Sequence, residues 1–355
     1  MDGLSEGIIA LDALGRITHV NPAVRALFHC RESGVITAPE QLTTTPELWA
    51  IYDRALRTHE AIVQNIAVDS TILRVSISPL EGERGSAAGV VGILRDVTQA
   101  ERLEQTRRDY VANVSHELRT PLTAMRALVE PLRDGLIRSE DQRQQVYSTI
   151  LRETLRLSRL VNDMLELSRL QSGSCSLEKH AFDPGRLLRS VYETYTQYAD
   201  DLDETLDLSM PDTLSPVLGN PDRTEQVLVA ILDNAMKYTP EGGHVSLIVQ
   251  ESAAEGLIRV SVQDTGPGIA PEDLPHVFER FYKADKAHQG KGTGLGLAIA
   301  HEIMRLLGEE LSVTSEFQKG STFTFTLHTI SSAEEPPIQT LPETETASGS
   351  PPACP

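Results

Sequence analysis

Residues 114–122 read VSHELRTPL, and this stretch lies within a long helical pattern. Apolar residues recur every three or four positions over 99–135, as one face of a helix requires. His116 and Thr120 are four residues apart and share a helical face, with Glu117 beside the histidine. A neutral imidazole is nucleophilic near its usual pKa of ~6.5, and a carboxylate that accepts its other ring proton increases this nucleophilicity. Taken alone, a surface histidine next to a helix-favouring glutamate is the commoner interpretation.

A second helical pattern covers residues 141–171 and predicts the other arm of an antiparallel hairpin. Two amphipathic helices cannot enclose a core by themselves, so the hairpin is expected to pair with a second copy as a four-helix bundle. The sequence therefore predicts a homodimer. The residues expected at the heptad seam are Ile150, Leu157, Leu160, Met164 and Leu167.

The following residues, 172–330, mix helical and strand patterns and predict an α/β sandwich with one helical layer. Near the end of this unit, Phe323 and Phe325 alternate with threonines that we expect to be exposed, in a hairpin around Gly320. The helices are expected near 185–199, 221–238 and 294–307, and the strands near 244–251, 256–263, 310–315 and 321–328.

Three short motifs in this unit contain residues that suit nucleotide chemistry. The amide oxygen of Asn234 suits a hydrated Mg²⁺ ion, and Lys237 on the same helical face can meet phosphate. Asp264 follows a strand and can accept a hydrogen bond from an exocyclic amine, while the glycines after it allow close backbone approach. Residues 290–297, GKGTGLGL, lead into a helix whose free N–H groups can bind phosphate. Singly, a helix cap and tight turns explain these motifs equally well.

In their joint order, these motifs resemble those of the sensor histidine kinases of two-component signalling. The resemblance covers about residues 101–330. The matching segments are the H-box SHELRTPL at 115–122, the N-box DNAMKYTPEGG at 233–243, the G1 box DTGPGI at 264–269, the F-box FERFYK at 278–283 and the G2 box GTGLGL at 292–297.

The resemblance implies a role for each matching residue. In the hairpin, His116 takes the γ-phosphoryl group of ATP, Glu117 serves as its base, and Thr120 positions water when the partner is dephosphorylated. In the C-terminal unit, Asn234 holds Mg²⁺ and Asp264 accepts from the adenine amine. The other implied ATP-binding residues, which contact phosphates or shape the pocket and its lid, are Lys237, Tyr238, Gly266, Gly268, Ile269, Lys283, Gly292, Thr293, Gly294, Leu295 and Gly296.

Two positions depart from the family pattern. Ala230 stands where the family often has a second asparagine, and Lys283 stands where it often has arginine. The second change matters because an ammonium group does not reproduce the bidentate contacts of a guanidinium.

Residues 1–98 form a separate pattern of five short strands with two helical stretches, one starting near Pro22 and one over 47–57. This predicts an α+β domain that resembles a PAS sensor domain, with SEGIIALDALGRITHVNPAVRALF at 5–28 and DVT at 96–98. The whole order resembles the cytoplasmic region of phosphate-regulon-type sensor kinases.

Together, the patterns predict a multidomain α+β chain in four parts. These are a PAS-like domain (1–98), a dimerisation and phosphotransfer hairpin (99–171), an α/β-sandwich ATP-binding domain of the histidine kinase, gyrase and chaperone type (172–330), and a disordered tail (331–355) rich in Ser, Thr, Glu and Pro.

Composition limits the partners and the location. Lys and Arg total 32 against 51 Asp and Glu, a net charge of −19, which argues against nucleic acid as the main partner. The cysteines, Cys30, Cys175 and Cys354, have no disulfide or zinc-site spacing. We find no membrane segment or signal peptide and expect a cytoplasmic protein, or a membrane-associated one if an upstream segment is missing.

The sequence therefore favours an ATP-dependent protein-histidine kinase that phosphorylates itself and passes the group to an aspartate of a response regulator, with possible phosphatase activity. One alternative is a catalytically silent signalling scaffold that retains the ATP-binding fold. Another is an ATPase of the gyrase and chaperone type, which the H-box and helical hairpin disfavour.

Overall fold

The computed structural model groups the chain into two compact units, residues 1–113 and 114–355. The predicted tail lies outside the described residues, as do the three cysteines and the first two residues of the glycine-rich segment 290–297. The described residues are 6–28, 42–43, 45–81, 87–172, 177–201, 203–283 and 292–330.

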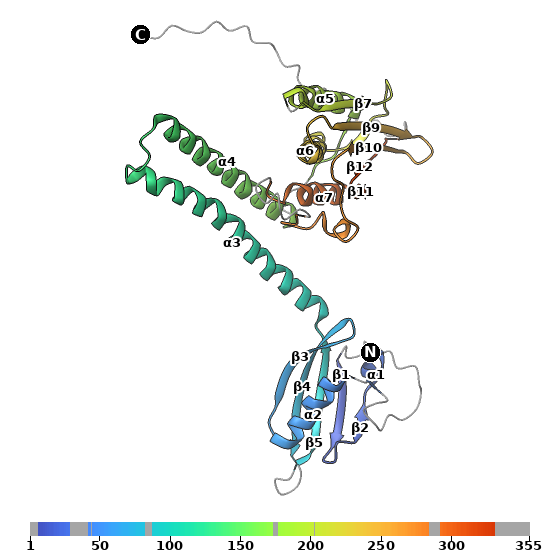
Figure 1. Cartoon of the computed structure of the whole chain (residues 1–355). Coiled ribbons are helices and arrows are strands. Elements are labelled where there is room, and N and C mark those ends of the chain that lie inside the picture. Colours follow the sequence, from blue (N-terminus) through green and yellow to red (C-terminus); the bar gives the residue numbers. More distant parts are fainter. Residues whose placement is uncertain are drawn as a thin grey trace. The chain divides into compact units, whose positions relative to one another are not determined.

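The N-terminal unit contains one antiparallel sheet in the order β2-β1-β5-β4-β3, which confirms the five predicted strands. Helix α2 packs on this sheet through the buried Leu48 and Tyr52, and Figure 1 shows it across the face of the sheet. The elements are β1 (Gly7–Asp12), β2 (Ile17–Val20), α1 (Pro22–Leu27), α2 (Pro46–Thr58), β3 (Ile62–Val68), β4 (Thr71–Glu81) and β5 (Ala87–Asp96).

Local polar contacts explain how this sheet begins. The Asp12 carboxylate accepts hydrogen bonds from the backbone N–H groups of Leu14 and Arg16, both at 2.9 Å, and closes the β1–β2 turn. The Asn21 side chain caps α1 by accepting from the N–H of Val24 at 3.1 Å, and it also accepts from the N–H of Ile8 at 2.9 Å. The helix start is thereby tied to the first strand.

Two long helices follow, α3 (Thr98–Arg133) and α4 (Glu140–Gln171), close to the predicted bounds. Helix α3 continues through Pro121 and Pro131 as one element. In α4, Leu160, Leu167 and Leu170 are at most 3% exposed and belong to the same hydrophobic cluster as the core of the C-terminal sandwich. Part of the predicted heptad seam thus packs against the sandwich in the single chain.

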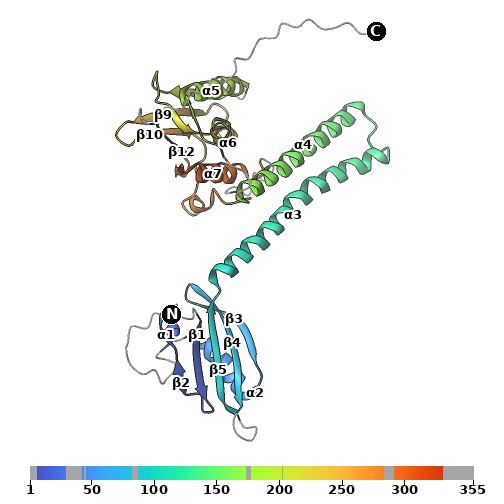
Figure 2. The ribbon, with the colours of Figure 1, turned by 180° about the vertical axis from the view of Figure 1, so that it is seen from behind.

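The C-terminal part is an α/β sandwich. Its main sheet has the order β11-β12-β10-β9-β7, and Figures 1 and 2 show α5, α6 and α7 together on one side of it. The elements are β6 (His180–Phe182), α5 (Pro184–Asp201), β7 (Thr205–Ser209), β8 (Val217–Gly219), α6 (Pro221–Tyr238), β9 (His244–Ser252), β10 (Leu257–Asp264), the 3₁₀ turn Leu274–His276, α7 (Gly296–Leu307), β11 (Leu311–Glu316) and β12 (Gly320–His328).

The predicted hairpin around Gly320 is present, with Glu316 opposite Gly320 in the β11–β12 register. Its threonines differ from the prediction, because Thr322, Thr324 and Thr326 are half-buried and not exposed. The reason is that β12 lies between β10 and β11 and has neighbours on both edges. The short strands β6, β7 and β8 were not predicted from the sequence, since three to five residues are too few for a clear alternation.

Candidate active site

A cavity of about 520 Å³ lies where α4 meets the sandwich, lined by α4, α6 and the start of α7. It gathers many of the predicted ATP-binding residues from segments that are far apart in the sequence. Those that line it are Asn234, Lys237, Tyr238, Lys283, Gly292, Thr293, Gly294 and Gly296. Ala230, which stands where the family that the sequence resembles often has asparagine, also lines the cavity.

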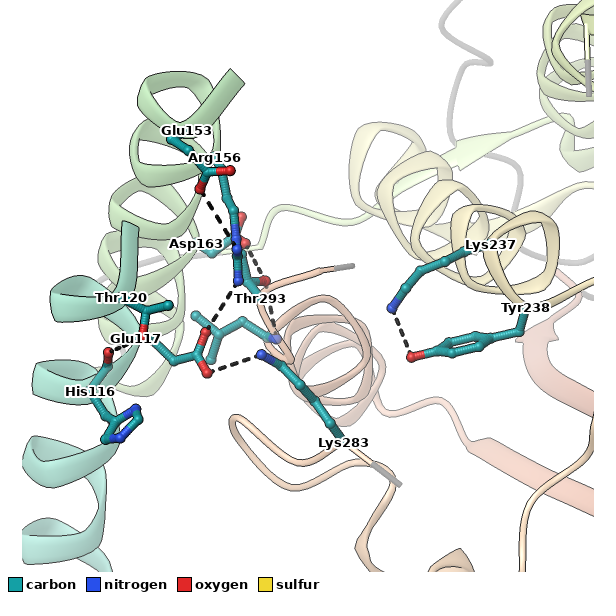
Figure 3. Close-up of polar contacts among 11 residues, drawn as sticks. His116, Glu117, Thr120, Glu153, Arg156, Asp163, Lys237, Tyr238, Lys283 and Thr293 are labelled. Atoms are coloured by element: carbon teal, nitrogen blue, oxygen red, sulfur yellow. Dashed lines mark hydrogen bonds and ion pairs between the residues drawn. The ribbon is translucent and has the colours of Figure 1, made fainter. Parts of the chain in front are cut away.

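The last two turns of α6 contribute the polar end of this cavity. Asn220 starts the helix by accepting from the N–H of Arg223 at 3.0 Å, with Pro221 at the first helical position. Asn234 and Lys237, three residues apart, consequently project from one face into the cavity. The Lys237 ammonium donates to the Tyr238 hydroxyl at 2.7 Å, a contact drawn in Figure 3. An amide oxygen and a cation are thus placed together.

The glycine-rich segment forms the edge of the cavity before α7. Gly294 has φ of +72° and its carbonyl accepts from the N–H of Phe281 at 2.8 Å. A Cβ at Gly294 would lie 2.9 Å from the backbone of Phe281, so only glycine fits this approach. The Thr293 hydroxyl donates to Asp163 of α4 at 2.9 Å. Leu295, by contrast, is fully buried in the core and does not line the cavity.

Asp264 lies at the end of β10 and is 5% exposed. Its Oδ1 accepts from the N–H groups of Gly266 at 2.9 Å and Ser321 at 3.2 Å. Burial raises the pKa of the Asp264 carboxyl, and these two hydrogen bonds oppose the shift. Oδ1 is therefore fixed by the fold, and within the described residues no hydrogen bond occupies Oδ2.

The G1 residues after Asp264 are placed by the β11–β12 hairpin. Gly268 has φ of +65°, and a Cβ there would lie 2.2 Å from the Glu316 carbonyl oxygen. The N–H of Ile269 donates to the Ser315 hydroxyl at 2.8 Å. Unlike the α6 residues, none of Asp264, Gly266, Gly268 and Ile269 lines the 520 Å³ cavity.

The H-box residues lie on α3 with different degrees of exposure. His116 and Thr120 are exposed, and the Thr120 hydroxyl donates to the His116 carbonyl at 3.2 Å. Neither residue lines the cavity. Glu117 is half-buried, and its carboxylate lies toward Lys283 and Arg156 in Figure 3. The helix thus separates an accessible histidine from a carboxylate that contacts the sandwich.

The contacts of Glu117 were not expected from the sequence. Its Oε1 is 3.0 Å from the Lys283 ammonium, and its Oε2 is 3.8 Å from the Arg156 guanidinium. Arg156 and Asp163 were not among the predicted site residues. Burial raises the pKa of the Asp163 carboxyl, and the hydrogen bond from Thr293 opposes this shift. Arg156 and Asp163 are seven residues apart and directly precede the seam residues Leu157 and Met164, so heptad spacing could have placed both on one face of α4.

A polar cluster fixes α4 to the beginning of α6. The Gln226 amide donates to Glu166 at 2.9 Å, and Arg223 contacts both Glu166 and Gln226. Together with the buried leucines of α4, these contacts hold the cavity wall formed by α4 against the wall formed by α6.

Two features of the described residues concern metal binding and the membrane. Within those ranges, no group of three or more His, Cys, Asp or Glu side chains is arranged to hold a metal ion. The donor set at Asn234 is instead a single amide oxygen in a cavity, which fits an ion such as Mg²⁺ that keeps most of its waters. No described helix combines the length and the apolar character needed to span a bilayer.

Known domain families match three parts of the chain. Residues 1–102 match the PAS fold, and residues 106–173 match the His Kinase A (phospho-acceptor) domain. Residues 219–330 match the histidine kinase-, DNA gyrase B-, and HSP90-like ATPase family. These matches confirm the predicted fold classes of the PAS-like part, the helical hairpin and the ATP-binding sandwich.

Two curated proteins are similar to this chain over most of its length. The sensor histidine kinase WalK of Bacillus subtilis is 36% identical over 91% of this chain and 54% of its own length. The sensor protein SrrB of Staphylococcus aureus is 39% identical over 68% of this chain and 41% of its own length. The chain thus spans about half the length of the curated relatives it matches.

The solved structure of histidine kinase ThkA in complex with the response regulator protein TrrA covers 91% of this chain and 96% of that chain. Its TM-score is 0.51 at 23% identity, so this likeness concerns the fold alone.

Proposed function

The chain belongs to the PAS-containing sensor histidine kinases, and from this premise we propose that it phosphorylates itself on His116 with ATP and passes the group to an aspartate of a response regulator. The observation that carries the proposal is the ion pair between Glu117 and Lys283. It joins the H-box to a residue that lines the candidate nucleotide cavity. The H-box and the cavity therefore belong to one compact unit, which supports the proposal.

The proposed transfer step assigns separate tasks to neighbouring residues. A ring nitrogen of His116 attacks the γ-phosphorus of ATP, the bond to the β-phosphate oxygen breaks, and ADP leaves. Glu117 accepts the proton from the other ring nitrogen, so that the imidazole remains a good nucleophile. The exposure of His116 supports this role, because the side chain is accessible both to nucleotide and to a partner protein.

We assign nucleotide binding to the predicted set. Lys237 and the segment Gly292–Gly296 would hold phosphates, Tyr238 would line the site, and Asp264 would accept from the adenine amine through its free oxygen. Gly266, Gly268 and Ile269 would shape the turn beneath the base. Asn234 would hold Mg²⁺, which when bound neutralises phosphate charge during transfer.

The proposal is tested by incubating the purified chain with γ-labelled ATP and Mg²⁺. Phosphohistidine is expected, and its label survives alkali and is lost in acid. Acid-stable label, or no label with a correctly folded protein, would overturn the proposal in favour of a silent scaffold.

The proposed partner is a response regulator, a class of protein that the ThkA structure contains. We place the exchange in the cytoplasm, where ATP is available. The domain limits 98/99, 171/172 and 330/331 are part of the same proposal.

Replacing Thr120 by alanine should lower regulator dephosphorylation about tenfold and leave autophosphorylation nearly unchanged, because the hydroxyl positions water and takes no part in the transfer to His116. The rates are measured with phosphorylated regulator and with labelled ATP, respectively. Thr149→Ala is a matched control, since its hydroxyl makes the same bond to the carbonyl four residues earlier, at 2.8 Å from Gln145. Equal losses in both reactions of Thr120→Ala would contradict the assignment.

The single chain leaves apolar side chains of the hairpin in water, and we expect a dimer that covers them. Leu122, Leu151 and Leu155 are 52%, 60% and 55% exposed. Light scattering at micromolar concentration should give twice the 38.9 kDa of one chain. Leu151→Glu with Leu155→Glu should shift the protein toward the monomer, because charges on a surface that the dimer covers are costly to bury. A monomeric unmodified chain would rule out the bundle.

A further inference from the structure

The Glu117 carboxylate contacts two cations that come from different parts of the unit. Oε1 is 3.0 Å from Lys283, which precedes the glycine-rich segment and lines the cavity. Oε2 is 3.8 Å from Arg156, which lies on α4 (Figure 3). These cation side chains are only 15% and 19% exposed, so water screens both pairs less than it screens surface pairs.

The two cations differ in what else can attract them. Lys283 lines the candidate nucleotide cavity, so a bound nucleotide phosphate would compete with Glu117 for its charge. Arg156 lies on the arm of the hairpin that faces Glu117, and the two arms are joined by a short connection between Arg133 and Glu140. Arg156 can therefore stay with Glu117 when Lys283 is drawn to phosphate.

Arg156 also forms an ion pair with a carboxylate on its own helix. Its Nη1 is 3.8 Å from Oε2 of Glu153, which lies one turn earlier on α4 and whose side chain is 17% exposed. The guanidinium thus bridges two carboxylates, one on each arm of the hairpin. At this distance the guanidinium acts on both carboxylates through its charge, which the arginine side chain retains at every pH at which the protein is folded.

We propose that Arg156 is a positioning residue that, supported by Glu153, holds Glu117 in place to accept the proton from His116 during phosphoryl transfer. This inference rests on the proposed kinase function. Arg156 acts through Glu117, while Lys283 exchanges its pairing with Glu117 for a nucleotide phosphate. Glu117 thereby keeps one cationic partner in both the empty and the loaded site.

The competing role for Arg156 is direct phosphate binding, because its side chain also lines the cavity. The two roles separate cleanly in kinetics. A residue that binds phosphate in the ground state changes ATP affinity, whereas a residue that orients the base changes the maximal rate.

The test compares Arg156→Gln, Arg156→Lys and Glu153→Gln with the unmodified full chain. Autophosphorylation at saturating ATP should fall about tenfold in Arg156→Gln, because a misplaced catalytic group loses most of its advantage. Its dissociation constant for ATP, measured by calorimetry, should stay within about twofold. Arg156→Lys should recover part of the rate, and Glu153→Gln should lose less than Arg156→Gln, since Glu153 pairs with the guanidinium and not with Glu117.

The matched control is Arg143→Gln, which removes an arginine paired at the same spacing with Glu140 on the exposed part of α4, at 2.7 Å. It should leave rate and affinity unchanged. An unchanged maximal rate in Arg156→Gln, or an ATP affinity that falls by the same factor as the rate, overturns the positioning role. An unmodified chain that takes no label overturns the kinase function and this inference with it.

Discussion

Replacing His116 by glutamine should reduce labelling by γ-labelled ATP to background, while ATP affinity stays within a few fold. Glutamine keeps a polar, helix-compatible side chain of similar reach, but an amide nitrogen is not a usable nucleophile and cannot hold a phosphoramidate. The exposed His116 lies outside the cavity, so its replacement leaves the cavity wall intact. The measurements are retained label and the ATP dissociation constant from calorimetry.

The control for this variant is His19→Gln, an exposed histidine of β2 in the other unit. It should label like the unmodified chain. Acid-labile label on His116→Gln would show that another histidine accepts the phosphoryl group, and it would refute the assigned role of His116.

The second large effect is expected at Asp264. In Asp264→Asn, the amide oxygen can still accept from Gly266 and Ser321, which leaves the NH₂ group where a carboxylate oxygen stood. The adenine amine would then meet a donor in place of an acceptor. An unpaired buried polar group costs about 1–3 kcal/mol, so ATP should bind ~10- to 100-fold more weakly.

The melting temperature of Asp264→Asn distinguishes a direct loss of ATP binding from misfolding. Burial raises the pKa of Asp264, which means that burying the charged carboxylate costs more free energy than burying a neutral group there. Removing the charge should therefore leave the melting temperature unchanged or raise it. Asp207→Asn, at an exposed carboxylate of β7, serves as the control for ATP binding. Unchanged ATP affinity in Asp264→Asn would show that the base does not bind at Asp264.

The sequence predicted the long elements well because their periodicity is strong. The helices α3 and α4 begin and end within a few residues of the predicted limits. The residues Asn234 and Lys237 were placed together correctly, since three residues on one helix determine their common face. Spacing along one helix determines which residues share a face, whatever the rest of the fold does.

Contacts between distant elements could not be predicted in the same way. The pairing of Glu117 with Lys283 joins residues 166 positions apart, and it depends on how α4 packs against the sandwich. Heptad spacing assigned Leu160 and Leu167 to a helical seam, but the same apolar side chains also fit the sandwich core. An apolar pattern shows that a face is buried without showing which partner covers it.

The central claim is that His116 accepts the phosphoryl group, and site mapping on the unmodified chain tests it most directly. After incubation with ATP and Mg²⁺, trypsin should release residues 109–119, DYVANVSHELR, in which His116 is the sole histidine. Fragmentation by electron transfer at neutral pH should place the phosphoryl group on His116. A phosphoryl group on Ser115, on Tyr110 or on a histidine of another peptide would contradict the claim.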